Sequence, residues 1–96
     1  MEIFFTKRGT EDYKSIKEYI SNKFGAKVAD AFENKLIDFL ELLKHFPELG
    51  SLEVLEKGIR GFQFSKQTRI FYRVKGSKII ILTLFDVRQH PDKKKV

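Results

Sequence analysis

The spacing of apolar and polar positions changes once along the chain, near Pro47, and this change divides the predicted elements into two groups. In the first group, the apolar piece Glu2–Thr6 predicts a short strand, which we expect Gly9–Thr10 to break. Thr10 is the expected N-terminal cap of a first helix, since its hydroxyl can accept a hydrogen bond from the first turn. The apolar positions of this helix recur at helical spacing up to Gly25 and are Tyr13, Ile16, Ile20 and Phe24.

A second helix is predicted from about Ala26 to Phe46, where Pro47 stops it by disfavouring helical geometry in the residue before it. Its apolar positions form one stripe, which comprises Val28, Ala29, Phe32, Leu36, Phe39, Leu40 and Leu43. Because only Gly25 separates the two helices, we expect them to form an antiparallel helical hairpin.

After Pro47 the spacing becomes that of strands. The segment Glu48–Glu56 is a connector of undetermined shape, and three strands are expected to follow at Lys57–Lys66, Thr68–Lys75 and Lys78–Asp86. Gly76-Ser77 suits a two-residue hairpin turn between the last two strands. The run Ile79–Phe85 is apolar at almost every position, which predicts a central strand covered on both sides. The whole chain, residues 1–96, is therefore expected to be one α+β domain with the order β-α-α-β-β-β and both helices on one sheet face.

The strand predicted at Thr68–Lys75 has two different faces. Successive strand side chains point to opposite sides, so Ile70, Tyr72 and Val74 would face a core. On the other side, Arg69 and Arg73 would flank Phe71. An exposed aromatic ring between two guanidinium groups is typical of a surface that binds a polyanion carrying flat bases.

Net charge supports a polyanion partner. The chain carries +6, but residues 1–50 hold eight Lys/Arg and nine Asp/Glu, whereas residues 51–96 hold eleven and four, which gives +7. This asymmetry predicts a nucleic acid or an acidic protein segment as partner of the second half. A basic surface kept for solubility is the alternative.

Other classes of chemistry are disfavoured by composition. There is no cysteine, and His45 and His90 lie far apart, so we expect no metal site, no thiol nucleophile and no cofactor. The N-terminus does not resemble a signal peptide, and no apolar run approaches the length of a membrane span. A cytoplasmic protein without a membrane partner is the expectation.

Two further groups are candidates for chemistry. Lys57, Arg60 and Lys66 would converge with the arginine strand if their own strand pairs with it. The end of the last strand gathers Asp86, Arg88, Gln89 and His90, and histidine has the pKa suited to acid–base work near neutrality. An ordinary loop histidine and an Asp86–Arg88 ion pair are the alternatives.

The order of these strings resembles the RelE/ParE superfamily of bacterial toxins from type II toxin–antitoxin modules. The resemblance is carried by LLKHFPELG (Leu42–Gly50), QTRIFYRV (Gln67–Val74) followed by a hairpin and IIILTLF (Ile79–Phe85), and the closing DVRQHP (Asp86–Pro91). It implies a growth-inhibiting toxin neutralised by a cognate antitoxin. RelE-like members cut mRNA on the ribosome, and ParE-like members poison DNA gyrase without a nuclease site.

By position, Arg69 resembles the strand arginine of the RNA-cleaving branch, and Arg88 and His90 fall near its C-terminal functional residues. Under the first hypothesis, a ribosome-dependent, metal-independent mRNA endoribonuclease, Arg69, Arg88 and His90 would be catalytic. The RNA would be bound by Lys57, Arg60, Lys66, Phe71, Arg73 and Gln89. The chain lacks a tyrosine after the last strand, and its closing RQHP is nearer to ParE-like members. A gyrase inhibitor and a non-toxic module that still binds an antitoxin are therefore the alternatives, and whether the chain is an enzyme stays open.

Overall fold

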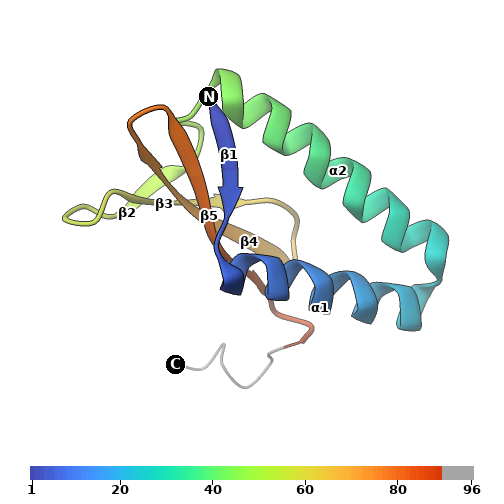
Figure 1. The fold of residues 1–96 in the computed structure, drawn as a ribbon. Coiled ribbons are helices and arrows are strands. Elements are labelled where there is room, and N and C mark those ends of the chain that lie inside the picture. The colour runs from blue at the N-terminus through green and yellow to red at the C-terminus, as the bar shows by residue number, and fades with distance from the viewer. Residues whose placement is uncertain (90–96) are drawn as a thin grey trace.

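A computed structural model describes residues 1–89 of the chain as one sheet and a pair of helices (Figure 1). The elements follow in the order β1 (Glu2–Phe5), α1 (Lys7–Phe24), α2 (Ala26–His45), β2 (Ser51–Val54), β3 (Ile59–Gln63), β4 (Thr68–Lys75) and β5 (Lys78–Asp86). The α+β prediction is confirmed, with an N-terminal strand, a helical hairpin and then the remaining strands. The structure adds β2, which lies inside the segment predicted as a connector.

The five strands lie in the order β1-β5-β4-β3-β2. β2 to β5 form an antiparallel meander, whereas β1 pairs in parallel with β5, Glu2 opposite Lys78 and Phe5 opposite Ile81. Both helices lie on the same side of the sheet, and they diverge from Gly25 towards β1 (Figure 1). The other side of the sheet is not covered by any element of residues 1–89.

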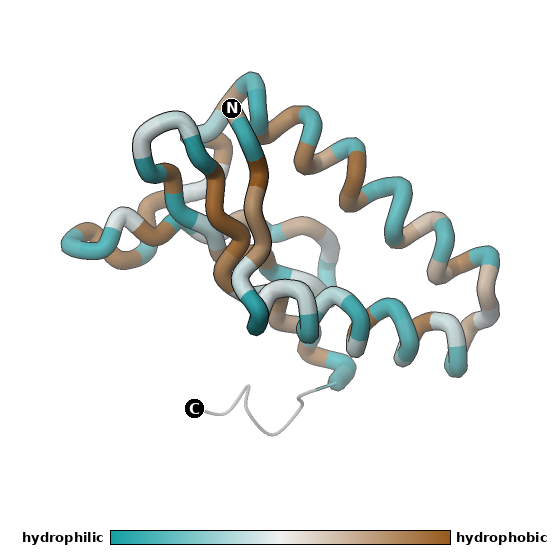
Figure 2. The backbone as a smooth tube through the Cα atoms, in the orientation of Figure 1, coloured by the Kyte–Doolittle hydropathy of each residue, from teal (hydrophilic) through white to brown (hydrophobic). Residues whose placement is uncertain are grey.

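The core lies between the helices and the sheet. Buried residues alternate along β4, as predicted, and along β5 on either side of its bulge. Apolar residues recur along both helices and along β5 (Figure 2). Ile70 and Tyr72 come from β4, and Ile79, Ile81 and Leu84 come from β5. These five side chains pack against Ile16 and Ile20 of α1 and against Ala29, Leu36, Phe39 and Leu43 of α2.

The predicted start of α1 is wrong by one turn. Thr6, not Thr10, is the N-terminal cap, and its hydroxyl accepts a hydrogen bond from the amide of Gly9 at 2.9 Å. Gly9 does not break the chain but lies inside the helix, where a Cβ atom would stand 2.7 Å from the carbonyl oxygen of Ile81. The glycine is therefore explained by close packing of α1 on β5, which the sequence pattern does not reveal.

Two strand predictions also change in detail. β3 is shorter than predicted, since Lys57 lies in the turn before it and Lys66 in the loop after it. β5 is an inner strand, as predicted, but its coverage is uneven: Ile79 and Ile81 are buried while Ile80 is half-buried. A bulge opposite Phe71 and Tyr72 interrupts its register with β4. Neither helix of the described residues is long and apolar enough to cross a bilayer.

Candidate functional site

The open face is the side of the sheet turned away from the helices. The predicted alternation of β4 is confirmed: Arg69, Phe71 and Arg73 are half-buried on this side, whereas Ile70 and Tyr72 are fully buried on the other. Outside the bulged parts of β2 and β5, pairing register and strand alternation give the members of the open face, to which Glu53 is added by its ion pair with Arg69. These members are Glu2, Phe4, Ser51, Glu53, Ile59, Gly61, Gln63, Arg69, Phe71, Arg73, Lys75, Lys78, Ile80 and Phe85.

Arg69 is the most fully engaged cation of the open face. One guanidinium nitrogen forms an ion pair with the carboxylate of Glu53, on edge strand β2, and another donates a hydrogen bond to the side-chain oxygen of Gln63 at 3.2 Å. The guanidinium carbon also lies 5.6 Å from the centre of the Phe71 ring. The predicted proximity of Arg69 and Phe71 is confirmed, but the sequence did not reveal the acidic partner.

Gly61 explains how Glu53 reaches Arg69 across the intervening strand. Gly61 pairs with Ser51 on one side and with Phe71 on the other. A Cβ atom at Gly61 would stand 2.6 Å from the Glu53 carboxylate and 2.8 Å from the Arg69 guanidinium. The ion pair therefore lies directly over a position without a side chain.

Arg73 has different surroundings at the other end of the strand. It pairs with Ile59 of β3 and Ile80 of β5, both apolar, and it has no ion-pair partner among residues 1–89. Within the described part of the chain it is thus a guanidinium held among apolar neighbours and available to an external anion.

The expected convergence of Lys57, Arg60 and Lys66 with the arginine strand is wrong. Arg60 pairs with Tyr72, so it points to the helix side, where it donates a hydrogen bond to the carbonyl oxygen of Gly50 at 2.8 Å. Lys57 and Lys66 lie at opposite ends of β3 and are exposed. The register between β3 and β4 determines which residues of the two strands share a face, and the sequence alone did not predict that register.

Arg88 is bound within the protein, as the ion-pair alternative predicted. Its guanidinium donates to both carboxylate oxygens of Asp86, at 2.9 and 2.7 Å, and it lies over the Tyr19 ring of α1, 5.8 Å from its centre. Asp86 is fully buried and also accepts a hydrogen bond from the hydroxyl of Thr68 at 2.8 Å. Gln89 in turn donates to the carbonyl and hydroxyl oxygens of Ser15.

The electrostatics of this pair follow from burial and hydrogen bonding together. Burial alone would raise the pKa of Asp86, but the hydrogen bonds from Arg88 and Thr68 outweigh it and hold that pKa below its ordinary value. The same carboxylate raises the pKa of Arg88. Arg88 and Gln89 therefore contact α1 and the end of β5, and the structure does not bring them to the open face. His90 lies outside the described residues.

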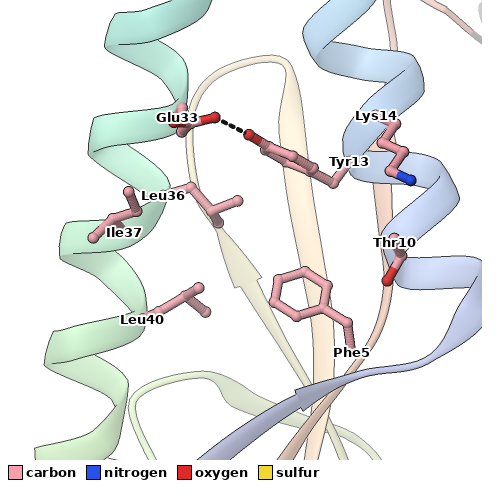
Figure 3. A pocket seen from close by; sticks show the side chains of 8 residues that line it. All are labelled: Phe5, Thr10, Tyr13, Lys14, Glu33, Leu36, Ile37 and Leu40. Atoms are coloured by element: carbon pink, nitrogen blue, oxygen red, sulfur yellow. Dashed lines mark hydrogen bonds between the residues drawn. The ribbon is translucent and has the colours of Figure 1, made fainter.

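A groove between the two helices was not predicted. It has a volume of ≈ 340 Å³, and Phe5 lies at its base, with Leu36, Ile37 and Leu40 of α2 along one wall (Figure 3). Across it, the hydroxyl of Tyr13 donates to Glu33, which also accepts a hydrogen bond from Lys17 at 2.5 Å. The sequence pattern predicted several of these residues as core positions of a helical hairpin. The groove opens because the two helices diverge, and no local sequence pattern indicates that divergence. Among residues 1–89, no cluster of His, Asp or Glu could hold a metal ion.

Comparison with known families gives one match, which spans most of the chain. Residues 3–91 match the family described as ParE toxin of type II toxin-antitoxin system, parDE. No curated protein sequence matches significantly.

Solved structures share the fold at low sequence identity. The chromosomal ParDE system from P. aeruginosa aligns with a TM-score of 0.73 at 21% identity, covering 90% of this chain and 95% of the other. A YoeB/ParE toxin from Agrobacterium tumefaciens aligns at 0.62 and 20% identity, covering 90% and 98%. The YoeB-YefM complex from Staphylococcus aureus aligns at 0.62 and 19% identity, covering 88% and 94%. At these identities, the structural likeness establishes a shared fold.

Proposed function

The chain belongs to the ParE toxin family of type II toxin–antitoxin systems, and on that premise we propose that it arrests growth by binding a macromolecular target rather than by cutting mRNA. The proposed target is DNA gyrase, which is the target implied by resemblance to the ParE-like branch. The proposed partner that neutralises the toxin is an antitoxin, since similar folds occur in the ParDE system and in the YoeB-YefM complex.

The observation that carries the proposal is that Arg69 and Arg88, two of the three catalytic candidates, do not share a site. Arg69 is on the open face in an ion pair with Glu53, whereas Arg88 is held by Asp86 against α1. RNA cleavage needs groups that position the phosphate and groups that transfer protons to meet around one reacting bond. Of the described residues, the open face offers cations and aromatic rings, which suit binding. Its carboxylates are Glu2 and Glu53, and Glu53 is already held in the ion pair with Arg69.

Induced expression in a bacterial host, with RNA and DNA followed together, tests this proposal. We expect growth arrest, loss of negative supercoiling and a DNA-damage response, while the ends of transcripts stay where they are in uninduced cells. New transcript ends that appear before any change in DNA would overturn the proposal in favour of the endoribonuclease. Expression without arrest would overturn both and indicate a module that only binds an antitoxin.

A matched pair of variants locates the working surface. Arg73→Ala removes the cation of the open face that has no internal ion-pair partner, and Arg8→Ala removes an arginine of α1 that is 72% exposed and lies 3.7 Å from Asp12. We expect Arg73→Ala to weaken arrest and Arg8→Ala to leave it unchanged. Equal arrest in the two variants would place the working surface elsewhere.

A further inference from the structure

We propose that the open face binds an acidic protein segment with interspersed apolar residues. In the unbound protein, Glu53 forms with Arg69 the ion pair that a carboxylate of this segment would form in the complex. The inference rests on the proposed function in one respect, since it takes a protein rather than RNA as the partner of the face. Glu53 then competes with the partner for Arg69 and sets the affinity of the whole surface.

The charge of the open face supports an acidic partner. Its cations are Arg69, Arg73, Lys75 and Lys78, and its anions are Glu2 and Glu53. The excess of positive charge attracts an acidic chain and accelerates its encounter. The two carboxylates, however, would stand close to any phosphate backbone laid across the strands, which disfavours a nucleic acid.

The apolar content of the face supports a protein segment. Phe4 is 43% exposed, with the ammonium group of Lys78 5.3 Å from its ring centre. Phe71 and Ile80 are half-buried on neighbouring strands. Apolar side chains of a partner would remove the rings and the aliphatic Ile80 from water together, whereas nucleobases would stack on the rings alone.

The Glu53–Arg69 pair has the properties of an exchangeable contact. The two side chains are 33% and 30% exposed, so solvent screens their attraction and the pair contributes little to stability. Glu53 also lies on β2, an edge strand whose four residues are all exposed and whose register with β3 is interrupted by a bulge. An incoming carboxylate can therefore replace Glu53 without disturbing the core.

The proposal is tested by measuring binding of a fluorescent random glutamate–tyrosine copolymer, an acidic polypeptide with apolar rings, to the full chain. Glu53→Gln removes the internal competitor, so we expect binding about two- to five-fold tighter than in the unmodified protein. Glu41→Gln is the control, because Glu41 pairs with Lys44 on α2 and its loss changes net charge equally, away from the open face. We expect Glu41→Gln to change binding much less.

Gly61→Ala provides a second variant that leaves net charge unchanged. The added methyl group would occupy the space in which Glu53 and Arg69 meet, and both side chains are flexible enough to move apart. If Glu53 competes for Arg69, Gly61→Ala tightens copolymer binding as Glu53→Gln does. If both variants bind the copolymer more tightly, the gain in affinity comes from loss of the ion pair and not from the change in net charge.

Three results would overturn the proposal: no binding of the copolymer, equal tightening by Glu41→Gln and Glu53→Gln, or tighter binding of single-stranded poly(U) than of the copolymer. The last would assign the face to nucleic acid. Growth arrest on induced expression is scored separately in the unmodified protein. Failure of copolymer binding in a chain that still arrests growth therefore refutes this inference alone, and absence of arrest refutes the proposed function.

Discussion

At the scale of single residues, Asp86 is the clearest case of a charge whose burial is compensated. It is fully buried, yet Thr68 and Arg88 supply hydrogen bonds to its carboxylate, and among residues 1–89 no buried side-chain oxygen or nitrogen lacks a partner. Removing the carboxylate would leave the Arg88 guanidinium beside an apolar core. The two residues are therefore best explained as anchors that fix where the chain leaves β5.

We predict that Asp86→Asn flattens the acid limb of the stability curve. The folded-state pKa of Asp86 is lower than its ordinary value of 3.8, so its contribution is fully present above that value. It is lost as the pH falls through the still lower folded pKa. Urea unfolding at pH 7 should show a loss of about 3 kcal/mol in the variant, and the difference from the unmodified protein should shrink below pH 4.

The control for this prediction is Asp38→Asn, which removes an exposed carboxylate from α2. It should leave both the stability at pH 7 and the shape of the acid limb unchanged. The free energies of unfolding of Asp86→Asn and of the unmodified protein could also differ by the same amount from pH 7 to pH 2. That result would contradict the conclusion that Asp86 stabilises the fold in its ionised form.

Gly9 gives a second prediction at this scale. A methyl group on Gly9 would meet the backbone oxygen of Ile81, which cannot move without shifting β5, so Gly9→Ala should destabilise the fold by about 1–3 kcal/mol. Gly61→Ala is the matched control, because its methyl group meets only mobile side-chain atoms of Glu53 and Arg69. Thermal unfolding of both variants checks the pair, and equal losses would contradict the packing argument.

The candidate site was predictable only where it depends on one strand. Alternation alone placed Arg69, Phe71 and Arg73 on one face, because strand geometry fixes that relation locally. The face of Arg60 and the partner of Arg69 depend on how β3 and β2 pair with β4, and neither pairing has a local sequence signal. Charged residues close in sequence were therefore grouped into a patch that the register divides between two faces.

At the scale of elements, the loop that leads into β2 is anchored to β4 through one buried tyrosine. The hydroxyl of Tyr72 donates to the carbonyl of Pro47 and accepts from the amide of Gly50, each at 2.8 Å. Burial raises the pKa of this hydroxyl, and the hydrogen bond from Gly50 lowers it in part. The loop before β2 is thereby fixed to β4 although none of the β2 residues is buried.

We predict that Tyr72→Phe loosens the loop before β2 and β2 itself more than it loosens the rest of the sheet. The variant leaves the buried amide of Gly50 without its acceptor, which costs about 1–3 kcal/mol. Exchange of the backbone amide hydrogens should accelerate over residues 48–54 by a larger factor than over β5. Tyr13→Phe, which removes a part-buried hydrogen bond to Glu33, should leave exchange in that loop unchanged. Uniform acceleration in both variants would indicate global destabilisation instead.

The helices and β4 were predictable from a strong period, and β5 from a continuous apolar run, whereas β2 was not predictable. A strand exposed at all four positions has no apolar alternation to mark it, and its place is set by β3 and by Tyr72. The start of α1 was missed for a related reason. Gly9 usually indicates a break, and only the close approach of β5 explains a glycine inside the helix.

At the scale of the whole molecule, the proposed function assigns different roles to the two sides of the sheet. Both helices lie on one side of the sheet (Figure 1), and that side carries the core and its fully buried residues. The open face carries the cations and aromatic rings to which we propose that a partner binds. The strands belong to both sides, so neighbouring residues of one strand can contribute to stability and to binding independently.

β1 allows this separation to be tested with two adjacent phenylalanines. Phe5 packs against the core at the base of the groove, and Phe4 is 43% exposed on the open face. We predict that Phe5→Ala lowers the free energy of unfolding by about 2–4 kcal/mol, since it opens a cavity between sheet and helices. Phe4→Ala should change it by less than about 1 kcal/mol but weaken binding of the glutamate–tyrosine copolymer. Urea unfolding and copolymer titration on both variants measure the two effects, and a Phe4→Ala variant that loses as much stability as Phe5→Ala would contradict the division between the faces.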